Sequence, residues 1–246
     1  MNGYRKELKF IVGDDTLIDV RNRIKGLMRP DDHQRGDHYR IRSIYFDSPA
    51  YTCYRENAAG VSPREKYRIR TYDCSEDVIV AEIKIRHRDT ISKMGTRITK
   101  DLFDRLISND PGEISSVLPA MIRTEELSSD SSGRRVLEKY AARMLTEAYR
   151  PACIVDYERS AFVYDIANVR ITLDRNVFAS REYGRMFDKS LTGRAALDTN
   201  QHILEIKYDE FLPDEISSVL GGMGLTRSSS SKYAKCLIRC CPEGDI

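Results

Sequence analysis

The sequence lacks most of the features that assign a protein to a function class at sight. It contains no tryptophan and only 4 histidines in 246 residues. These histidines, His33, His38, His87 and His202, are too scattered to indicate a catalytic triad or a zinc site. No glycine-rich loop of the P-loop or protein-kinase type occurs either, so any phosphate-binding site has to be built from other residues.

Long apolar runs are also absent. No stretch approaches the roughly 18 apolar residues expected of a membrane span, and the first residues contain no apolar signal region. The 6 cysteines show no metal-binding spacing. Two of them, Cys240 and Cys241, are adjacent, which favours reduced thiols over a disulfide framework. We therefore expect a cytoplasmic protein with no membrane segment of its own.

The net charge is small. Lys+Arg number 40 and Asp+Glu number 38, a formal charge of +2. This balance does not indicate the broad basic field of a nucleic-acid binder, so we expect no nucleic-acid partner, and any basic patch must be local. With 41% hydrophobic residues, a chain of this length can bury one sizeable core. We predict a single domain over residues 1–246.

The most informative pattern is a set of strand-like stretches whose alternate positions carry charge. They are Tyr67–Thr71 (YRIRT), Ala81–Arg86 (AEIKIR), Val169–Asp174 (VRITLD) and Leu204–Tyr208 (LEIKY). Because side chains alternate between the two faces of a strand, the charged residues share one face, and isoleucines and leucines occupy the other. A further strand with the same alternation is predicted at Tyr4–Val12 (YRKELKFIV).

This charged face is mostly basic. Its bases are Lys9, Arg68, Arg70, Lys84, Arg86, Arg170 and Lys207, and its acids are Glu7, Glu82, Asp174 and Glu205. Seven bases minus four acids leave +3, which exceeds the +2 of the entire chain. The positive charge of the protein is therefore concentrated on these strands.

Two interpretations of the charged face remain open at this point. Either it lines a water-filled barrel and contacts phosphates, or it is the solvated face of an ordinary amphipathic sheet. Periodicity alone favours the second, because one wet face is the common antiparallel pattern. The excess of bases favours the first, since the planar arginine fork binds two phosphate oxygens at once. Acids among such bases would form salt bridges, the commoner outcome, or hold Mg²⁺ or Mn²⁺ together with phosphates.

The remaining elements define the fold class. Helical patterns gather at about residues 100–150, where Thr99 is expected to cap the first helix. The strands are mostly not separated by single helices, which predicts an antiparallel α+β fold with a closed or nearly closed β-barrel and flanking helices. Ser228–Ser231 precede the last helix, with Lys232 and Lys235 behind them. This segment is either an ordinary serine cap or an anion site at a helix N-terminus.

Eight short motifs occur in an order that is characteristic of one family. They are RKELKF (Arg5–Phe10), SIYFDS (Ser43–Ser48), REKYRIRTY (Arg64–Tyr72), EIK (Glu82–Lys84), DYERSAF (Asp156–Phe162), VRITLD (Val169–Asp174), ILEIKY (Ile203–Tyr208) and SKY (Ser231–Tyr233). From about Tyr4 to Cys240 the chain resembles the VTC domain, the polyphosphate polymerase module of the vacuolar transporter chaperone family. That domain is one of the triphosphate tunnel metalloenzymes, which are related to CYTH proteins.

The resemblance implies an antiparallel tunnel in which ATP donates its γ-phosphate to a growing polyphosphate chain with the help of Mn²⁺ or Mg²⁺. It implies Glu205 as the metal ligand and Lys84, Arg159 and Arg170 as catalytic residues. The phosphate contacts that it implies are Lys9, Arg68, Arg70, Lys84, Lys93, Arg159, Arg170, Lys207 and Lys232. Lys235 is a lesser candidate, and Arg97 is an alternative to Lys93.

Other functions fit the same resemblance. A tunnel of this kind in which water attacks would be a triphosphatase or polyphosphatase. A third interpretation is a non-catalytic module that binds polyphosphate, inositol phosphate or RNA. Glu205 favours the enzymes, because anion binding needs no metal ligand. RNA is the least favoured ligand, since no stacking aromatics alternate with the bases. The eukaryotic polymerase subunits also carry a phosphate-sensing domain and membrane helices, and the resemblance names no protein partner for this chain.

Overall fold

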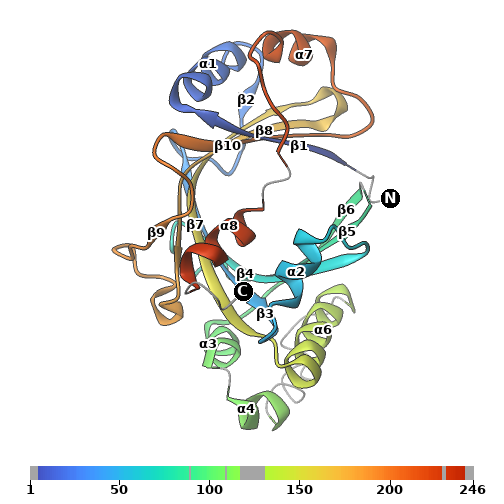
Figure 1. The fold of residues 1–246 in the computed structure, drawn as a ribbon, viewed down its shortest axis with the longest axis vertical. Coiled ribbons are helices and arrows are strands. Elements are labelled where there is room, and N and C mark those ends of the chain that lie inside the picture. Colours follow the sequence, from blue (N-terminus) through green and yellow to red (C-terminus); the bar gives the residue numbers. More distant parts are fainter. Residues whose placement is uncertain (1–4, 89, 109, 117–130, 229–230, 242–246) are drawn as a thin grey trace.

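One curled antiparallel sheet organises the structure, a computed structural model that describes residues 5–88, 90–108, 110–116, 131–228 and 231–241. The strands are β1 (Lys6–Gly13), β2 (Arg29–Pro30), β3 (Tyr39–Asp47), β4 (Arg64–Tyr72), β5 (Val80–His87), β6 (Thr90–Arg97), β7 (Arg150–Tyr164), β8 (Val169–Ser180), β9 (Arg194–Ala195) and β10 (Gln201–Tyr208). Their order is β1-β10-β8-β7-β3-β4-β5-β6, with β2 beside β7 and β9 beside β8. Figure 1 shows the sheet curling from β1 round to β6.

Two groups of helices cover the outer face of the sheet, one near each end of the molecule, and two further helices lie on its inner side. The helices are α1 (Asp14–Ile24), α2 (Thr52–Ala58), α3 (Lys100–Ser108), α4 (Pro111–Ser116), α6 (Ser131–Glu147), α7 (Asp214–Leu220) and α8 (Lys232–Cys240), with short 3₁₀ turns at Ile166–Asn168 and Tyr183–Arg185. The predicted α+β fold with an antiparallel, barrel-like sheet is confirmed. The sheet is curled but open: among the described residues, backbone pairing does not join its two edge strands, β1 and β6.

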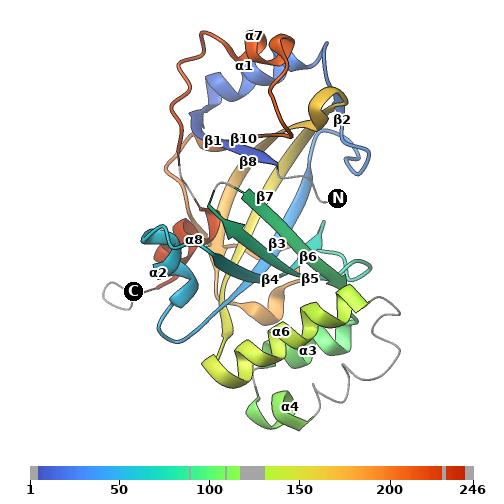
Figure 2. The same cartoon turned by 90° about the vertical axis from the view of Figure 1, so that its right-hand side faces the viewer.

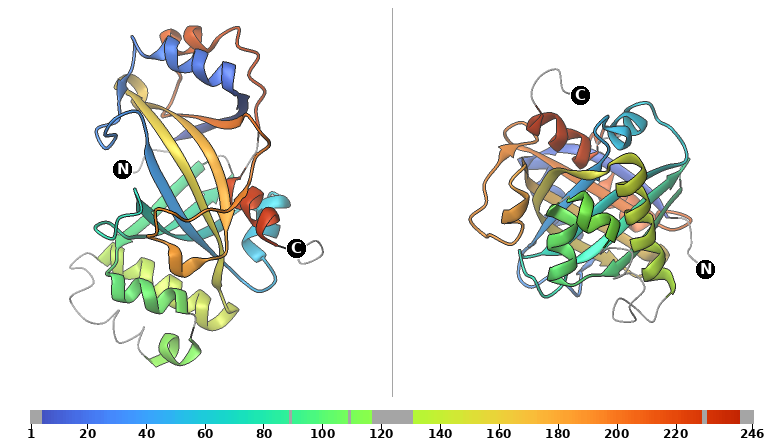
Figure 3. Two further views of the ribbon diagram at one scale, coloured as in Figure 1. Left: turned by 90° about the vertical axis from the view of Figure 1, so that its left-hand side faces the viewer. Right: turned by 90° about the horizontal axis from the view of Figure 1, so that it is seen from below.

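The outer face of the sheet carries the rows of isoleucine and leucine that form much of the hydrophobic core. Helices α3, α4 and α6 cover β3 to β6, where Ile44, Ile69 and Ile83 are fully buried. Helices α1 and α7 cover β1, β10 and β8, where a second cluster includes Ile171 and Leu204 (Figures 2 and 3). Burying one such side chain contributes about 1.5–3 kcal/mol, and a one-residue register slip would expose the whole row. The hydrocarbon face therefore points outward, and the charged face points into the curl.

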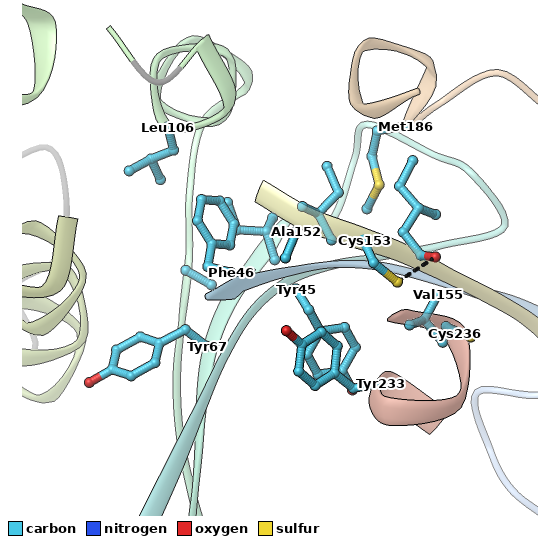
Figure 4. Packing of buried hydrophobic residues seen from close by; sticks show 14 of the residues in the cluster. Tyr45, Phe46, Tyr67, Leu106, Ala152, Cys153, Val155, Met186, Tyr233 and Cys236 are labelled. Carbon is cyan, nitrogen blue, oxygen red and sulfur yellow. Dashed lines mark hydrogen bonds between the residues drawn. The ribbon is translucent and has the colours of Figure 1, made fainter. Parts of the chain in front are cut away.

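Helices α2 and α8 lie next to each other on the inner side of the curl. The Tyr233 ring on α8 stacks on Tyr45 of β3 at 4.8 Å between centroids, and Cys236 lies near Cys153 of β7 (Figure 4). Helix α8 begins after Ser231, whose hydroxyl accepts a hydrogen bond from the Ala234 N–H. The predicted serine cap is therefore present. All six cysteines carry free thiols.

Helix α2 was not among the expected elements. Its N–H groups at Cys53 and Tyr54 donate to the Asp47 carboxylate at 2.8 and 3.1 Å, and the hydroxyl of Tyr233 donates to the same carboxylate at 2.5 Å. The capping residue, Asp47, thus lies at the end of β3, several residues before the helix. The sequence indicated only the end of a strand at this position. One carboxylate holds α2 and α8 together.

The helical segment predicted at about 100–150 contains α3, α4 and α6, and residues 117–130 of it lie outside the described residues. Thr99 caps α3 as expected, since its hydroxyl accepts from the Leu102 N–H at 3.2 Å. Within the described ranges, no helix combines the length and the hydropathy needed to cross a lipid bilayer.

Candidate functional site

The charged face of the curl encloses a cavity of about 480 Å³. Side chains from β1, β3, β4, β5, β7, β10, α2 and α8 line it. In the described part of the chain its basic lining residues are Lys9, Arg64, Lys66, Arg68, Arg70, Lys84, Arg86, Arg159, Lys207 and Lys232, and its acidic ones are Glu7 and Glu205. Seven of the nine phosphate contacts implied by the sequence, and the implied metal ligand, therefore meet in one space.

Glu205 lies among four cations. Its Oε1 is 2.8 Å from Lys232 Nζ and 3.5 Å from Lys9 Nζ. Its Oε2 is 3.7 Å from both Arg159 Nη2 and Lys207 Nζ. Burial alone would raise the pKa of Glu205, but these cations hold it well below the usual range. Glu205 is therefore an ionised, buried oxygen donor at the centre of the bases.

A second carboxylate, Glu7, completes this centre. Its oxygens lie 2.9 Å from Lys9 Nζ and 3.5 Å from the ammonium groups of both Lys84 and Lys207. Burial opposes ionisation, but Lys84, Lys9 and Lys207 lower the pKa of Glu7 far below its usual value. The contact with Lys84 joins the edge strand β1 to β5, which lies next to the opposite edge strand, β6. The alternation Glu7-Leu8-Lys9 could have identified Glu7 as a site residue.

Two further carboxylates hold the arginines in place just behind the cavity surface. Asp174 accepts two hydrogen bonds from Arg159, at 2.6 and 2.7 Å, and lies 2.5 Å from Lys232. Glu82 lies 2.6 Å from Arg68 and 2.7 Å from Lys93. Burial would raise the pKa of each carboxyl, and the cations lower it instead. The bidentate pair of Arg159 and Asp174 fixes the orientation of that guanidinium before a ligand arrives.

The cavity stays strongly basic after these pairs are counted. Ten described bases line it and four carboxylates contact them, so ten minus four leaves a formal charge of +6. Tyrosine rings pack between the bases: the Tyr157 ring lies 5.2 Å from the Arg159 guanidinium and 5.1 Å from Lys232 Nζ. An anion with several charges is the ligand that such a space favours.

Two implied phosphate contacts do not line the cavity. Lys93 on β6 has a 55% exposed side chain and pairs with Glu82. Arg170 on β8 pairs with Asp31 at 2.9 Å and donates to the Tyr39 hydroxyl at 3.1 Å. Lys235 and Arg97 are also absent from the lining, and Arg97 is exposed. Roles for these four residues remain predictions.

Three basic residues of the described lining were not among the sequence candidates. Lys66 and Arg64 precede Arg68 at alternate positions of β4, so the same strand alternation could have found them. Arg86 belongs to the charged face of β5, although no role was assigned to it. Arg64 and Lys66 lie within the REKYRIRTY motif, but only Arg68 and Arg70 of that motif were given a role.

The comparison with protein families agrees with this geometry. A model of the VTC domain matches residues 4–239. The chain belongs to the VTC domain family. No curated protein matches it significantly.

Solved structures resemble this VTC domain at low sequence identity. A putative adenylate cyclase from Bacillus halodurans is 12% identical over 93% of this chain and 94% of its own, with a TM-score of 0.52. The PH1819 protein from Pyrococcus horikoshii OT3 is 15% identical over 96% of this chain and 98% of its own, with a TM-score of 0.47. At such identity the first likeness shows a shared fold alone. Together with the family match it confirms that this VTC domain has the triphosphate tunnel fold.

Proposed function

We propose that this VTC domain is a metal-dependent phosphotransferase that moves the γ-phosphoryl group of ATP onto a growing polyphosphate chain. The observation that carries the proposal is the convergence of bases from six elements on two ionised carboxylates, Glu7 and Glu205, inside one cavity. Both substrates and both products of this reaction are phosphate anhydrides. A cavity with a large excess of positive charge suits all four.

The bases would share the work of binding. Arg68, Arg70 and Arg159 offer planar forks for two phosphate oxygens each, and the cavity lysines offer point charges. The arginines are already held by Glu82 and Asp174, so little side-chain entropy is lost when a ligand binds. Because the site is largely buried, each contact is stronger than it would be in water.

The carboxylates fit a divalent metal ion. Mg²⁺ and Mn²⁺ prefer oxygen donors, and such ions are usually bound through one or two carboxylates together with substrate phosphates. Glu205 would hold the ion, with Glu7 as the neighbouring carboxylate. In the described ranges no group of three or more His, Cys, Asp or Glu side chains forms a metal site, which suits an ion completed by the substrate. When bound, it would neutralise charge on phosphate oxygens.

The chemistry needs no protein nucleophile. A terminal oxygen of the polyphosphate chain attacks the γ-phosphorus in line, the bond from that phosphorus to the β,γ-bridging oxygen breaks, and its electrons leave with ADP. Lys84 and Arg159, which line the cavity, would stabilise charge on the transferred group. The role of Arg170 stays a prediction that requires its release from Asp31.

The test is to incubate the purified protein with ATP and Mn²⁺ or Mg²⁺ and to resolve the products on a gel stained for polyphosphate, with ADP measured in parallel. The proposal predicts polyphosphate chains, with one ADP released for each phosphoanhydride bond formed in them. Free phosphate without chains would replace the polymerase with a hydrolase. Tight ATP binding without turnover would leave a binding module and would contradict an enzymatic role.

A further inference from the structure

Like-charged residues face each other across β4 and β5. Arg64 is opposite Arg86, and Lys66 is opposite Lys84 in the strand register. All four line the cavity. Like charges directly opposite each other destabilise a sheet. Lys84 has a carboxylate partner in Glu7, but no described carboxylate lies within 4.0 Å of the other three.

Neutral oxygens hold the Lys66 ammonium. Its Nζ donates to Asn57 Oδ1 on α2 at 2.7 Å and to Ser231 Oγ, the N-cap of α8, at 2.9 Å. An ammonium has three donors, so these contacts fix the group and leave one donor for a ligand. Burial, Lys9 and Arg64 together lower the pKa of Lys66 to about 7. The charge of Lys66 is thus positioned but not compensated.

The two arginines are in the same situation. Arg64 Nη1 donates to the Val61 carbonyl at 2.7 Å, and Arg86 Nε donates to the Arg88 carbonyl at 3.0 Å. A guanidinium has five N–H donors, so most of this capacity is not used by these contacts. Burial and the nearby Arg86 lower the pKa of Arg64. An anion at this end of the cavity would relieve the repulsion and satisfy the donors.

The bases of β4 form a row longer than the triphosphate group of a nucleotide. Arg64, Lys66, Arg68 and Arg70 lie at alternate positions of one strand. Six residue steps at about 3.3 Å each make the row roughly 20 Å long. Three linked phosphates do not reach from one end to the other, whereas a longer chain does.

We infer that Arg64, Lys66 and Arg86 form a second phosphate-binding subsite, which holds the part of a polyphosphate chain that lies beyond Glu7 and Glu205. The inference rests on the proposed function, because it identifies polyphosphate as the ligand. A nucleobase fits this end less well. The aromatic rings that line the cavity are engaged elsewhere: Tyr45 contacts Arg68 and Tyr233, and Tyr157 contacts Arg159 and Lys232.

Calorimetric titration without metal, using tripolyphosphate and a polyphosphate several tens of units long, tests the subsite. The variant is Arg64→Gln with Arg86→Gln. Loss of two charge-assisted contacts is expected to weaken long-chain binding at least tenfold, because the loss of even one such contact has about this effect. Tripolyphosphate affinity should stay unchanged. The variant should fold, because it removes a like-charged pair, and its melting temperature checks this.

The matched control is Arg134→Gln with Arg135→Gln, which removes two exposed arginines of α6 outside the cavity. It should change neither affinity. Equal losses for both ligands in the Arg64/Arg86 variant, or no loss for either, would overturn the subsite and leave the proposed function intact. Failure of the unmodified protein to bind either ligand would contradict the proposed function itself.

Discussion

The cavity has two regions that use the same side chains in opposite electrostatic settings. In the carboxylate region, around Glu7 and Glu205, each lysine has an acidic partner within 4.0 Å. In the carboxylate-free region, formed by Arg64, Lys66 and Arg86, the described chain offers none. Asp174 and Glu205 raise the pKa of Lys232 against the effect of burial, whereas the pKa of Lys66 falls to about 7.

Lys84 lies at the boundary between the regions and shows the influence of both. It pairs with Glu7 on one side and is opposite Lys66 on the other. Burial and Lys9 hold its pKa well below the usual value despite Glu7. The carboxylate region is therefore organised before a ligand arrives, while the carboxylate-free region is stabilised by the ligand. The first suits a metal ion and a reacting triphosphate, and the second suits a passive stretch of polyanion.

The largest predicted effect lies in the carboxylate region. Glu205→Gln should lower metal-dependent ATP turnover on the order of 10²-fold or more, because the proposed metal ligand is lost. Binding of metal-free tripolyphosphate should survive, since the substitution removes a negative charge from among the bases. Turnover assays and calorimetry would measure the two effects.

The control for this substitution is Glu215→Gln, which changes an exposed glutamate on α7. It should leave turnover unchanged. If Glu205→Gln turned over ATP at the original rate, Glu205 would have no place in the mechanism, and the carboxylate region would lose its distinguishing role.

A smaller effect is expected from pH in the carboxylate-free region. Phosphate binding needs the charged form of Lys66, so above pH 7 the lysine must take up a proton when polyphosphate binds. The groups that set its pKa are Lys9, Arg64, Cys53 and Arg68, together with burial. Between pH 6.5 and 8.5, long-chain affinity should fall about tenfold relative to the Lys66→Arg variant, whose charge persists.

The lowered pKa of Lys66 also determines how the stability of the ligand-free protein changes with pH. The ordinary pKa of lysine is 10.5 and that of folded Lys66 is about 7, so the unfolded chain binds more protons between these values. The contribution of Lys66 to the free energy of unfolding therefore rises with pH across that window. For binding, the contradicting result would be a long-chain polyphosphate affinity that changes with pH in the same way in the original protein and in Lys66→Arg. Lys66 would then have no place in the subsite.

The strand alternation predicted much of the site and of the fold. It placed Arg68, Arg70, Lys84, Lys207 and Glu205 on one face, and all five line the cavity. It could not decide whether that face pointed inward, because the answer depends on where the amphipathic helices pack. Helices α1, α6 and α7 cover the isoleucine face, and only the tertiary structure shows this.

Features that depend on contacts outside the strand alternation were the hardest to predict. Arg170 follows the alternation, but its guanidinium binds Asp31, far away in the sequence. Helix α2 begins at Thr52 because Asp47, at the end of the preceding strand, accepts its first N–H groups. Such contacts leave no periodic signal, so neither could be read from the pattern of charged and apolar positions.

Phosphate binding in this cavity is tested most directly by titrating tripolyphosphate into the original protein and into the variant with Arg68→Ala and Arg70→Ala. Both arginines line the cavity beside Glu82, and each charge-assisted contact contributes about 1.5–3 kcal/mol. We expect the variant to bind tripolyphosphate at least about 10²-fold more weakly than the original protein does, with the same stoichiometry. Retained affinity in a variant that is still folded would show that phosphate does not bind in this cavity.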